Sequence, residues 1–135
     1  MCGIAGELNL NKELKQSLII NNSLSHRGPH NRNSIRLKKN LIFYHTRLKI
    51  IDLSDESNQP MSSENSRYTI IYNGELYNFK EIKNELEKKG YYFNTNGDTE
   101  VFLKGFVEYG INFFKKINGI FAVSIYDKKL NCIYF

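Results

Sequence analysis

The stretch Met1-Cys2-Gly3-Ile4-Ala5-Gly6 opens the chain and decides how the rest of it is interpreted. Removal of Met1 would make Cys2 the N-terminal residue, which would then carry both a thiol and a free α-amine. Such an amine has an ordinary pKa of about 7.7–8.0, so part of it is neutral near pH 7 and can act as the base for the thiol. The alternative is that Cys2 is a small apolar residue at the start of a strand. The opening therefore predicts either an N-terminal nucleophile or an ordinary first strand.

The composition indicates one domain, or part of one, with enough apolar residues for a core. The chain has 135 residues, of which 41% are hydrophobic, and this length allows a sizeable buried core. Its net charge of +5 comes mostly from scattered lysines rather than from an arginine-rich stripe, so we expect no nucleic-acid partner. No long apolar run and no secretory signal is present. We therefore expect a cytoplasmic protein without a membrane partner.

The spacing of apolar residues predicts an α+β fold with antiparallel sheets. Strands are expected over residues 2–8, 34–38, 41–51, 68–72, 91–95, 119–126 and 130–135, and helices over 12–25, 79–89 and 98–109. Asn78 and Glu81 are spaced as a capping box for the second helix, and Gly90 would end it. The chain stops at Phe135 within an apolar strand, so we expect residues 1–135 to be a partial domain that lacks its C-terminal part.

Arg47 and Asp98 are candidates for binding the two charged ends of a free amino acid. The planar guanidinium of Arg47 could hold a carboxylate through two parallel hydrogen bonds, whereas the alternative is a surface ion pair. Asp98 could hold an ammonium group, but it also stands where the N-cap of a helix is expected. The sequence alone leaves both alternatives open.

Asn73-Gly74 follows a predicted strand, and this dipeptide has two common uses. It is typical of a type I′ hairpin turn. It could instead form an oxyanion hole, in which the Asn73 side-chain amide and the Gly74 backbone N–H bind the oxygen of a tetrahedral intermediate. Neither use is excluded by the residues themselves.

Six motifs follow one another along nearly the whole chain and together resemble a known family. They are Met1-Cys2-Gly3-Ile4-Ala5-Gly6, His26-Arg27-Gly28-Pro29, His45-Thr46-Arg47-Leu48-Lys49-Ile50-Ile51-Asp52-Leu53, Asn58-Gln59-Pro60-Met61, Tyr72-Asn73-Gly74-Glu75-Leu76-Tyr77-Asn78 and Gly97-Asp98-Thr99-Glu100. This set resembles the N-terminal glutaminase domain of asparagine synthetase (glutamine-hydrolysing), a class II glutamine amidotransferase.

The resemblance implies a fold and a reaction. The fold would be an N-terminal-nucleophile (Ntn) hydrolase αββα sandwich, with two antiparallel sheets flanked by helices. Cys2 would attack the side-chain amide of glutamine, release ammonia and form a γ-glutamyl thioester, with Asn73 and Gly74 as the oxyanion hole. Arg47 would bind the α-carboxylate of the substrate and Asp98 its α-amine. The glutamine pocket would further be lined by Leu48, Lys49, Ile50, Ile51, Glu75 and Gly97.

The same resemblance implies partners that lie outside this chain. A synthetase domain or subunit would receive the ammonia and make asparagine from aspartate, and ATP and magnesium would bind there. No metal or cofactor is expected in this chain, and a homodimer is conceivable. Two alternatives stay open: an amidotransferase domain that serves another acceptor, such as a polysaccharide sugar, or a truncated, catalytically silent remnant that binds glutamine.

Overall fold

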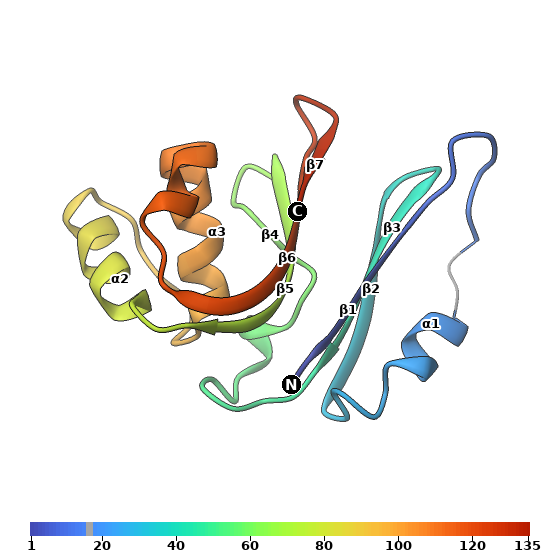
Figure 1. Ribbon diagram of the computed structural model, residues 1–135, viewed down its shortest axis with the longest axis horizontal. Helices are drawn as coiled ribbons and strands as arrows, with labels where there is room; N and C mark the ends of the chain where they lie inside the picture. The colour runs from blue at the N-terminus through green and yellow to red at the C-terminus, as the bar shows by residue number, and fades with distance from the viewer. Residues whose placement is uncertain (16–17) are drawn as a thin grey trace.

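Two antiparallel sheets lie face to face in the computed structural model, which describes residues 1–15 and 18–135 (Figure 1). The first sheet has the strand order β1-β3-β2 and the second the order β4-β5-β6-β7. Their bounds are β1 (Gly3–Leu8), β2 (Asn31–Lys38), β3 (Leu41–Arg47), β4 (Met61–Ser62), β5 (Tyr68–Leu76), β6 (Gly119–Asp127) and β7 (Cys132–Tyr134). All neighbouring strands are antiparallel, which confirms the predicted α+β class.

Helices cover the outer face of each sheet, so the layers follow the order helix, sheet, sheet, helix. Helices α2 (Phe79–Lys88) and α3 (Asp98–Tyr109) lie on the second sheet, and α1 (Leu18–Ser23) lies on the first (Figure 1). The described residues also contain two short 3₁₀ segments, Asp55–Ser57 and Gly110–Lys115. The predicted αββα sandwich is therefore confirmed.

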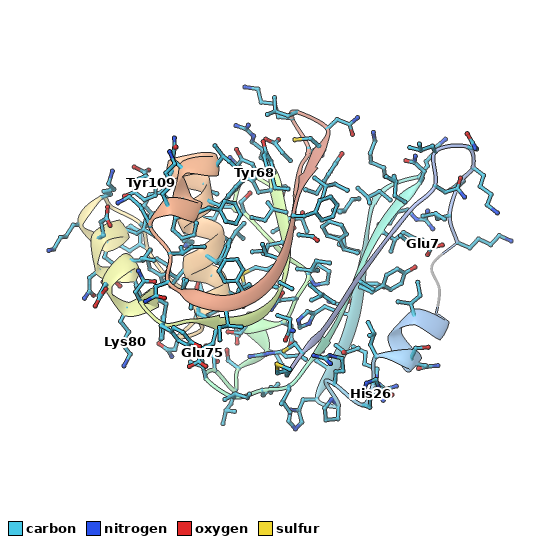
Figure 2. The ribbon with its side chains drawn as sticks, in the orientation of Figure 1. Glu7, His26, Tyr68, Glu75, Lys80 and Tyr109 are labelled. Carbon is cyan, nitrogen blue, oxygen red and sulfur yellow. The ribbon has the colours of Figure 1, made fainter. Side chains whose placement is uncertain are left out.

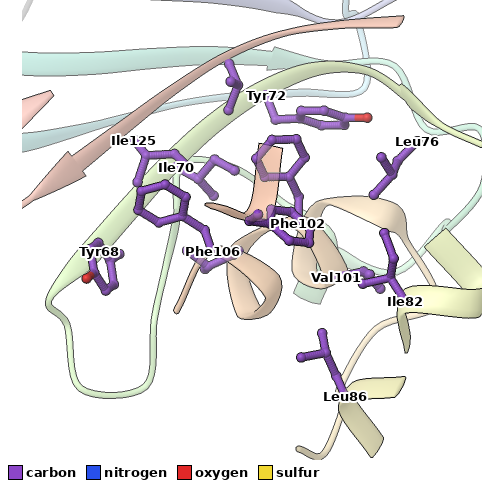
Figure 3. Close-up of a cluster of buried hydrophobic side chains, with 13 residues drawn as sticks. Tyr68, Ile70, Tyr72, Leu76, Ile82, Leu86, Val101, Phe102, Phe106 and Ile125 are labelled. Carbon is purple, nitrogen blue, oxygen red and sulfur yellow. The ribbon is translucent and has the colours of Figure 1, made fainter. Parts of the chain in front are cut away.

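The larger apolar core lies between the second sheet and its two helices (Figure 3). Because successive strand residues point to opposite faces, Tyr68, Ile70 and Tyr72 of β5 all turn toward α3. The fully buried Phe102 of α3 packs against Tyr72 with ring centroids 5.3 Å apart. Burial of a side chain of this size contributes about 1.5–3 kcal/mol, so this core fixes β5 relative to the start of α3.

The opposite faces of the two sheets meet in a smaller apolar cluster that contains Phe43 of β3 and Ile71 of β5. Strand residues two apart share a face, so Arg47 points in the same direction as Phe43, and Asn73 in the same direction as Ile71. The uninterrupted β5–β6 register from Tyr68 to Leu76 supports this placement for Asn73. The fold thus directs the side chains of Arg47 and Asn73 into the space between the sheets.

Two predicted strands differ from the structure because side chains occupy their backbone donors. The strand over 41–51 ends at Arg47, since Leu48 N–H donates to Cys2 Sγ and Lys49 N–H to His30 Nδ1. Residues 91–95 form no strand, because the Glu100 carboxylate accepts the N–H groups of Asn94 and Thr95. In both segments a side chain takes the place of a neighbouring strand.

Other boundaries also differ from the sequence-based prediction. Strand β5 continues through Asn73-Gly74 to Leu76, which excludes the hairpin turn as the use of this dipeptide. The helix expected over 12–25 is helical at Leu18–Ser23, and residues 16–17 of that prediction lie outside the described residues. Strand β4 lies between the strands predicted over 41–51 and 68–72, where no strand was predicted.

The predicted helix caps use their side chains elsewhere. Asn78 makes no capping hydrogen bond, and its side chain instead donates to Lys116 O and accepts from Asn118 N–H. The N-cap of α3 is Gly97 rather than Asp98. Gly90 does follow α2 with a φ of +91°, as a helix-ending glycine should. No helix in the described part of the chain is long and apolar enough to cross a membrane.

His45 of β3 is fully buried, and neither of its ring nitrogens has a hydrogen-bond partner among the described residues. Burial lowers its pKa to about 4, the nearby Tyr72 backbone opposes this shift, and the Arg47 charge adds to it. Between pH 6.5 and 4 the unfolded chain therefore binds a proton that the folded protein does not bind. The stability associated with neutral His45 is complete above pH 6.5 and is lost as the pH falls to about 4.

We expect this loss to amount to about 3 kcal/mol in the free energy of unfolding. Urea unfolding should be measured from pH 7 to pH 4 for the wild type and for the variant His45→Phe. The carboxylates titrate in both proteins, so the difference between the two free energies of unfolding reports the contribution of His45. The difference between the two curves should shrink or change sign in favour of the variant as the pH falls. Parallel curves would contradict a buried, neutral His45.

Candidate active site

A cavity of about 370 Å³ lies where the start of β1, the loop after β3, strand β5 and the start of α3 come together. In the orientation shared by the two figures, Glu75 (Figure 2) and the N-terminus (Figure 1) both lie along the lower edge of the molecule. The volume is within the range of small-molecule sites. Of the residues predicted for the site, the cavity is lined by Cys2, Arg47, Leu48, Ile50, Ile51, Asn73, Gly74, Glu75, Gly97 and Asp98.

Cys2 is held at the cavity by contacts to its side chain and to its backbone. The Leu48 N–H donates to Cys2 Sγ at 3.4 Å, and Arg27 Nε donates to the Cys2 carbonyl at 3.0 Å. The Cys2 thiol in turn donates to the Leu48 carbonyl at 3.8 Å, so the backbone of Leu48 fixes the position of the sulfur. Gly28 lies against the backbone of Thr46 and Arg47 so closely that a Cβ would overlap it. The Arg27-Gly28 segment therefore shapes the wall behind Cys2.

Arg47 is almost completely buried and uses only part of its guanidinium on the protein. Nη1 donates to Ser54 O at 2.5 Å and to Asn58 Oδ1 at 2.9 Å, and Nη2 donates to Asp52 O at 2.5 Å. Nε has no hydrogen-bond partner among the described residues. Nε is therefore available to a ligand, and Arg47 lines the cavity.

Another arginine in this chain binds a carboxylate through its Nε and Nη2. Arg67 donates from Nε and Nη2 to the two oxygens of Asp127, at 3.1 and 2.7 Å. A ligand carboxylate at Arg47 could adopt this two-point geometry through Nε and the second hydrogen of Nη2, while Nη1 keeps its bonds to Ser54 and Asn58. Arg47 can thus anchor the loop and a ligand at the same time.

Asp52 connects that loop to the start of α3. Its carboxylate accepts Ser54 N–H at 2.7 Å and Asn96 N–H at 2.6 Å. Burial alone would raise the pKa of Asp52, but these donors outweigh it, and the pKa lies well below its usual range. Arg47 at the end of β3 also holds the Asp52 carbonyl. The loop is therefore fixed both to β3 and to the segment before α3.

Asn73 and Gly74 lie within β5, opposite Ala122 and Phe121 of β6. The Asn73 side-chain amide is partly exposed at the cavity and has no hydrogen-bond partner among the described residues, so it is available to a ligand. A Cβ on Gly74 would overlap the Ile120 carbonyl and the Phe121 side chain. Only glycine therefore permits the close approach of β5 and β6 at this point.

Asp98 is buried at the first turn of α3. Its Oδ2 accepts the Tyr72 hydroxyl at 2.9 Å and the Leu76 N–H at 3.0 Å. These bonds leave Oδ1 for a ligand. Burial raises the pKa of Asp98, while the Leu76 N–H and the Tyr72 hydroxyl act in the opposite direction. A neighbouring ammonium group would compensate this burial.

If Asp98 binds an ammonium group, the KM for an amino-acid substrate should depend on pH. Protonation removes the negative charge, so the KM should rise as the pH falls, beginning above the pH at which an ordinary aspartate titrates. The variant Asp98→Asn should have a KM raised by about 10- to 100-fold, the value of a lost charged hydrogen bond, and no such rise at low pH. Steady-state kinetics across the acid range provide the measurement. An unchanged acid limb in the variant would contradict this role.

Some residues of the cavity were not predicted, and one predicted residue does not line it. Lys49 pairs with Asp55 at 2.8 Å and lies outside the lining residues. Gln59, Tyr72 and Thr99 belong to the six sequence motifs, and this membership was the only indication that they lie near the site. The sequence offered no signal for Ser57 or Ile120. The further lining residues are Met1, Asp52, Ser57, Gln59, Tyr72, Tyr77, Thr99 and Ile120.

A larger cavity of about 470 Å³ lies beside α3 and the loop that follows β4. Its buried charges are used within the protein. Lys104 Nζ pairs with Glu100 at 3.0 Å and with Glu64 at 3.1 Å, and Glu100 also accepts Thr95 N–H at 2.8 Å. The smaller cavity therefore offers the better site for a charged ligand.

Comparison with known proteins identifies the family to which the chain is related. A family model described as a glutamine amidotransferase domain matches residues 1–135. Asparagine synthetase (glutamine-hydrolysing) 3 of Bacillus subtilis is 37% identical over 140 residues, a match that covers 99% of this chain and 22% of that protein. Asparagine synthetase B (glutamine-hydrolysing) of Escherichia coli is 31% identical over 133 residues, covering 96% of this chain and 24% of that protein. The chain thus spans less than a quarter of the length of either relative.

A solved structure is similar in fold. It is the glutamine phosphoribosylpyrophosphate amidotransferase of Bacillus subtilis in complex with ADP and GMP. The TM-score is 0.57 with 26% sequence identity, and the match covers 67% of this chain and 22% of that one.

Proposed function

This chain belongs to the glutamine amidotransferase domain family, and from that premise we propose that it hydrolyses the side-chain amide of L-glutamine with Cys2 as the nucleophile. The observation that carries the proposal is the cavity in which Cys2, Arg47, Asn73 and Asp98 meet. These residues supply a nucleophile, an anion-binding edge, a free amide donor and a cation-binding carboxylate. A free amino acid with a side-chain amide has the matching groups.

Substrate binding uses the two charged residues at the cavity. The Nε–Nη2 edge of Arg47 binds the α-carboxylate, and Asp98 Oδ1 accepts a hydrogen bond from the α-ammonium group. Leu48, Ile50, Ile51, Glu75 and Gly97 border the remaining space. Two charged contacts at one end of the substrate orient its amide toward Cys2, and this positioning lowers the entropic cost of the attack.

The reaction proceeds through a γ-glutamyl thioester. Once Met1 is removed, the free amine of Cys2 takes the thiol proton, and Sγ forms a bond to the amide carbon of glutamine. The carbonyl oxygen gains negative charge and is stabilised by the Asn73 amide and the Gly74 N–H. The C–N bond then breaks, and ammonia leaves with the proton that the amine received. Water adds to the thioester, and glutamate and the free thiol are released.

Removal of Met1 is a requirement of this mechanism. In the unprocessed chain the Cys2 nitrogen is an amide, which cannot serve as a base. Met1 is 73% exposed, so it is accessible to an aminopeptidase. The thiol and the base then appear in one residue by a single cleavage.

The ammonia is proposed to pass to a synthetase domain or subunit that forms asparagine. The support is the similarity to glutamine-hydrolysing asparagine synthetases, of which this chain matches under a quarter. ATP and magnesium would bind in that partner, and the step at Cys2 uses neither of them. We propose a cytoplasmic location, and a homodimer stays a prediction.

The chain contains a matched control for the nucleophile. Cys2 and Cys132 are both free and partly buried, and only Cys2 lines the cavity. Ammonia release from L-glutamine by the processed, full-length protein should disappear in the variant Cys2→Ala and persist in Cys132→Ala. Activity that survives in Cys2→Ala would overturn the proposal. A folded, processed wild type without activity would favour a silent glutamine-binding remnant.

A further inference from the structure

Gln59 is buried, with 3% of its surface exposed, and its side-chain amide is bonded almost entirely to the protein. Oε1 accepts the Tyr72 N–H at 2.6 Å, while Nε2 donates to the Tyr72 carbonyl at 3.1 Å and to Thr99 Oγ1 at 3.2 Å. Both N–H groups of the amide are therefore used. Gln59 borders the cavity but has no donor left for a ligand.

The Gln59 amide takes the place of a backbone in the second sheet. Strand β4 pairs Met61 with Ile70 and Ser62 with Thr69. If this antiparallel register continued two residues toward the N-terminus, Gln59 would lie opposite Tyr72. The β4 strand starts only at Met61, and Pro60 has no N–H to donate. The side chain of Gln59 offers one acceptor and one donor to Tyr72, as a neighbouring strand would.

The three bonds join two parts of the site that are far apart in the sequence. Tyr72 directly precedes Asn73, which is proposed to bind the oxyanion. Thr99 directly follows Asp98, which is proposed to bind the substrate α-amine. A single buried amide thus spans the segments that contact the reacting end and the charged end of glutamine.

We propose that Gln59 is a positioning residue, which sets the separation between the oxyanion-binding amide of Asn73 and the amine-binding carboxylate of Asp98. This inference rests on the proposed function. Gln59 acts through Tyr72 and Thr99 and does not contact the substrate. The Tyr72–Asp98 hydrogen bond joins the same two segments, so the loss of Gln59 loosens the arrangement and does not abolish it.

The variant Gln59→Leu has a similar size and lacks the three hydrogen bonds. We expect its kcat/KM for L-glutamine to fall by about 10- to 100-fold, because a displacement of about 1 Å in an oriented site has effects of this order. The preference for L-glutamine over glutaramic acid, which lacks the α-amine, should decrease several-fold. Alkylation of Cys2 by iodoacetamide needs neither segment and should keep its rate.

A matched control separates positioning from general stability. Ser62 Oγ and Thr69 Oγ1 also join β4 to β5, at 3.0 Å, and neither residue lines the cavity. The variant Ser62→Ala should retain the substrate preference and the kcat/KM of the wild type. Thermal unfolding of each variant in the full-length protein identifies the fraction that is folded at the assay temperature.

The outcomes are distinct. A reduced preference in Gln59→Leu, with wild-type alkylation of Cys2 and an unaffected Ser62→Ala, supports the inference. An unchanged preference with kcat/KM within about twofold of the wild type overturns it, as does an equal loss in Ser62→Ala. If Gln59→Leu does not fold, Thr99→Val removes the bond to α3 alone, and the same two criteria apply to it. Absence of glutamine hydrolysis in the wild type would overturn the proposed function instead.

Discussion

Replacement of Asn73 by alanine is expected to lower the kcat for glutamine hydrolysis by about 10²- to 10³-fold, with little change in KM. The reason is that the Asn73 amide has no partner among the described residues and points into the space that Cys2 borders. A donor that binds the oxygen only when it carries negative charge stabilises the transition state and leaves the bound substrate unaffected. Steady-state measurement of ammonia release gives both constants.

The control for this substitution is Asn78→Ala. Asn78 follows the same strand, but its amide bonds to Lys116 and Asn118, outside the cavity. This variant should lose some stability and keep its kcat. If Asn73→Ala raises the KM and preserves the kcat, Asn73 binds the ground state and the oxyanion assignment is wrong.

Replacement of Arg47 by lysine is expected to reduce kcat/KM by about 10²-fold, because the two charged hydrogen bonds to the substrate carboxylate are weakened and each is worth about 1.5–3 kcal/mol. Lysine keeps the positive charge but loses the planar edge that binds a carboxylate at two points. It also cannot satisfy Ser54 O, Asp52 O and Asn58 Oδ1 together. The free energy of unfolding should therefore fall by about 2 kcal/mol or more.

Arg67→Lys provides the comparison for Arg47→Lys. Arg67 makes the same type of two-point contact, with Asp127, at a distance from the cavity. Urea unfolding and glutamine kinetics should separate the two variants, since Arg67→Lys is expected to affect stability alone. Wild-type kcat/KM in Arg47→Lys would exclude a carboxylate-binding role for Arg47.

The sequence predicted the α+β class because strands and helices depend on patterns that repeat within single segments, whereas the αββα layers were expected from the family resemblance. Alternating apolar residues identified β5 and β6, and the helical spacing identified α2 and α3. The segment 91–95 has a strand-like pattern as well, yet Tyr92 is 85% exposed. Its backbone donors bond to Glu100, a contact that the local pattern does not contain.

The candidate site was predicted by residue type, and its arrangement required the structure. Cys2, Arg47, Asn73 and Asp98 each had a chemical reason to be chosen, but every one of them also had an ordinary alternative. The hairpin alternative for Asn73 fails because β5 continues to Leu76. The N-cap alternative for Asp98 fails because Gly97 holds that position.

Gln59 could not have been assigned from the sequence. Its part depends on the register of β4 against β5 and on the place where α3 begins. Both are tertiary features, and the motif Asn58-Gln59-Pro60-Met61 contains no local indication of them. A buried amide that replaces a strand is visible only once the strands have been placed.

The role of Cys2 as the nucleophile of a glutamine site can be tested by measuring the intact mass of the protein before and after treatment with a diazoketone analogue of glutamine, followed by peptide mapping. We expect a chain without Met1 that gains a single adduct on Cys2, and excess L-glutamine should suppress this adduct. Cys132 should remain unmodified. A folded, processed protein that is not labelled at Cys2, or that is labelled equally in the presence of glutamine, would contradict the claim that Cys2 is the nucleophile of a glutamine site.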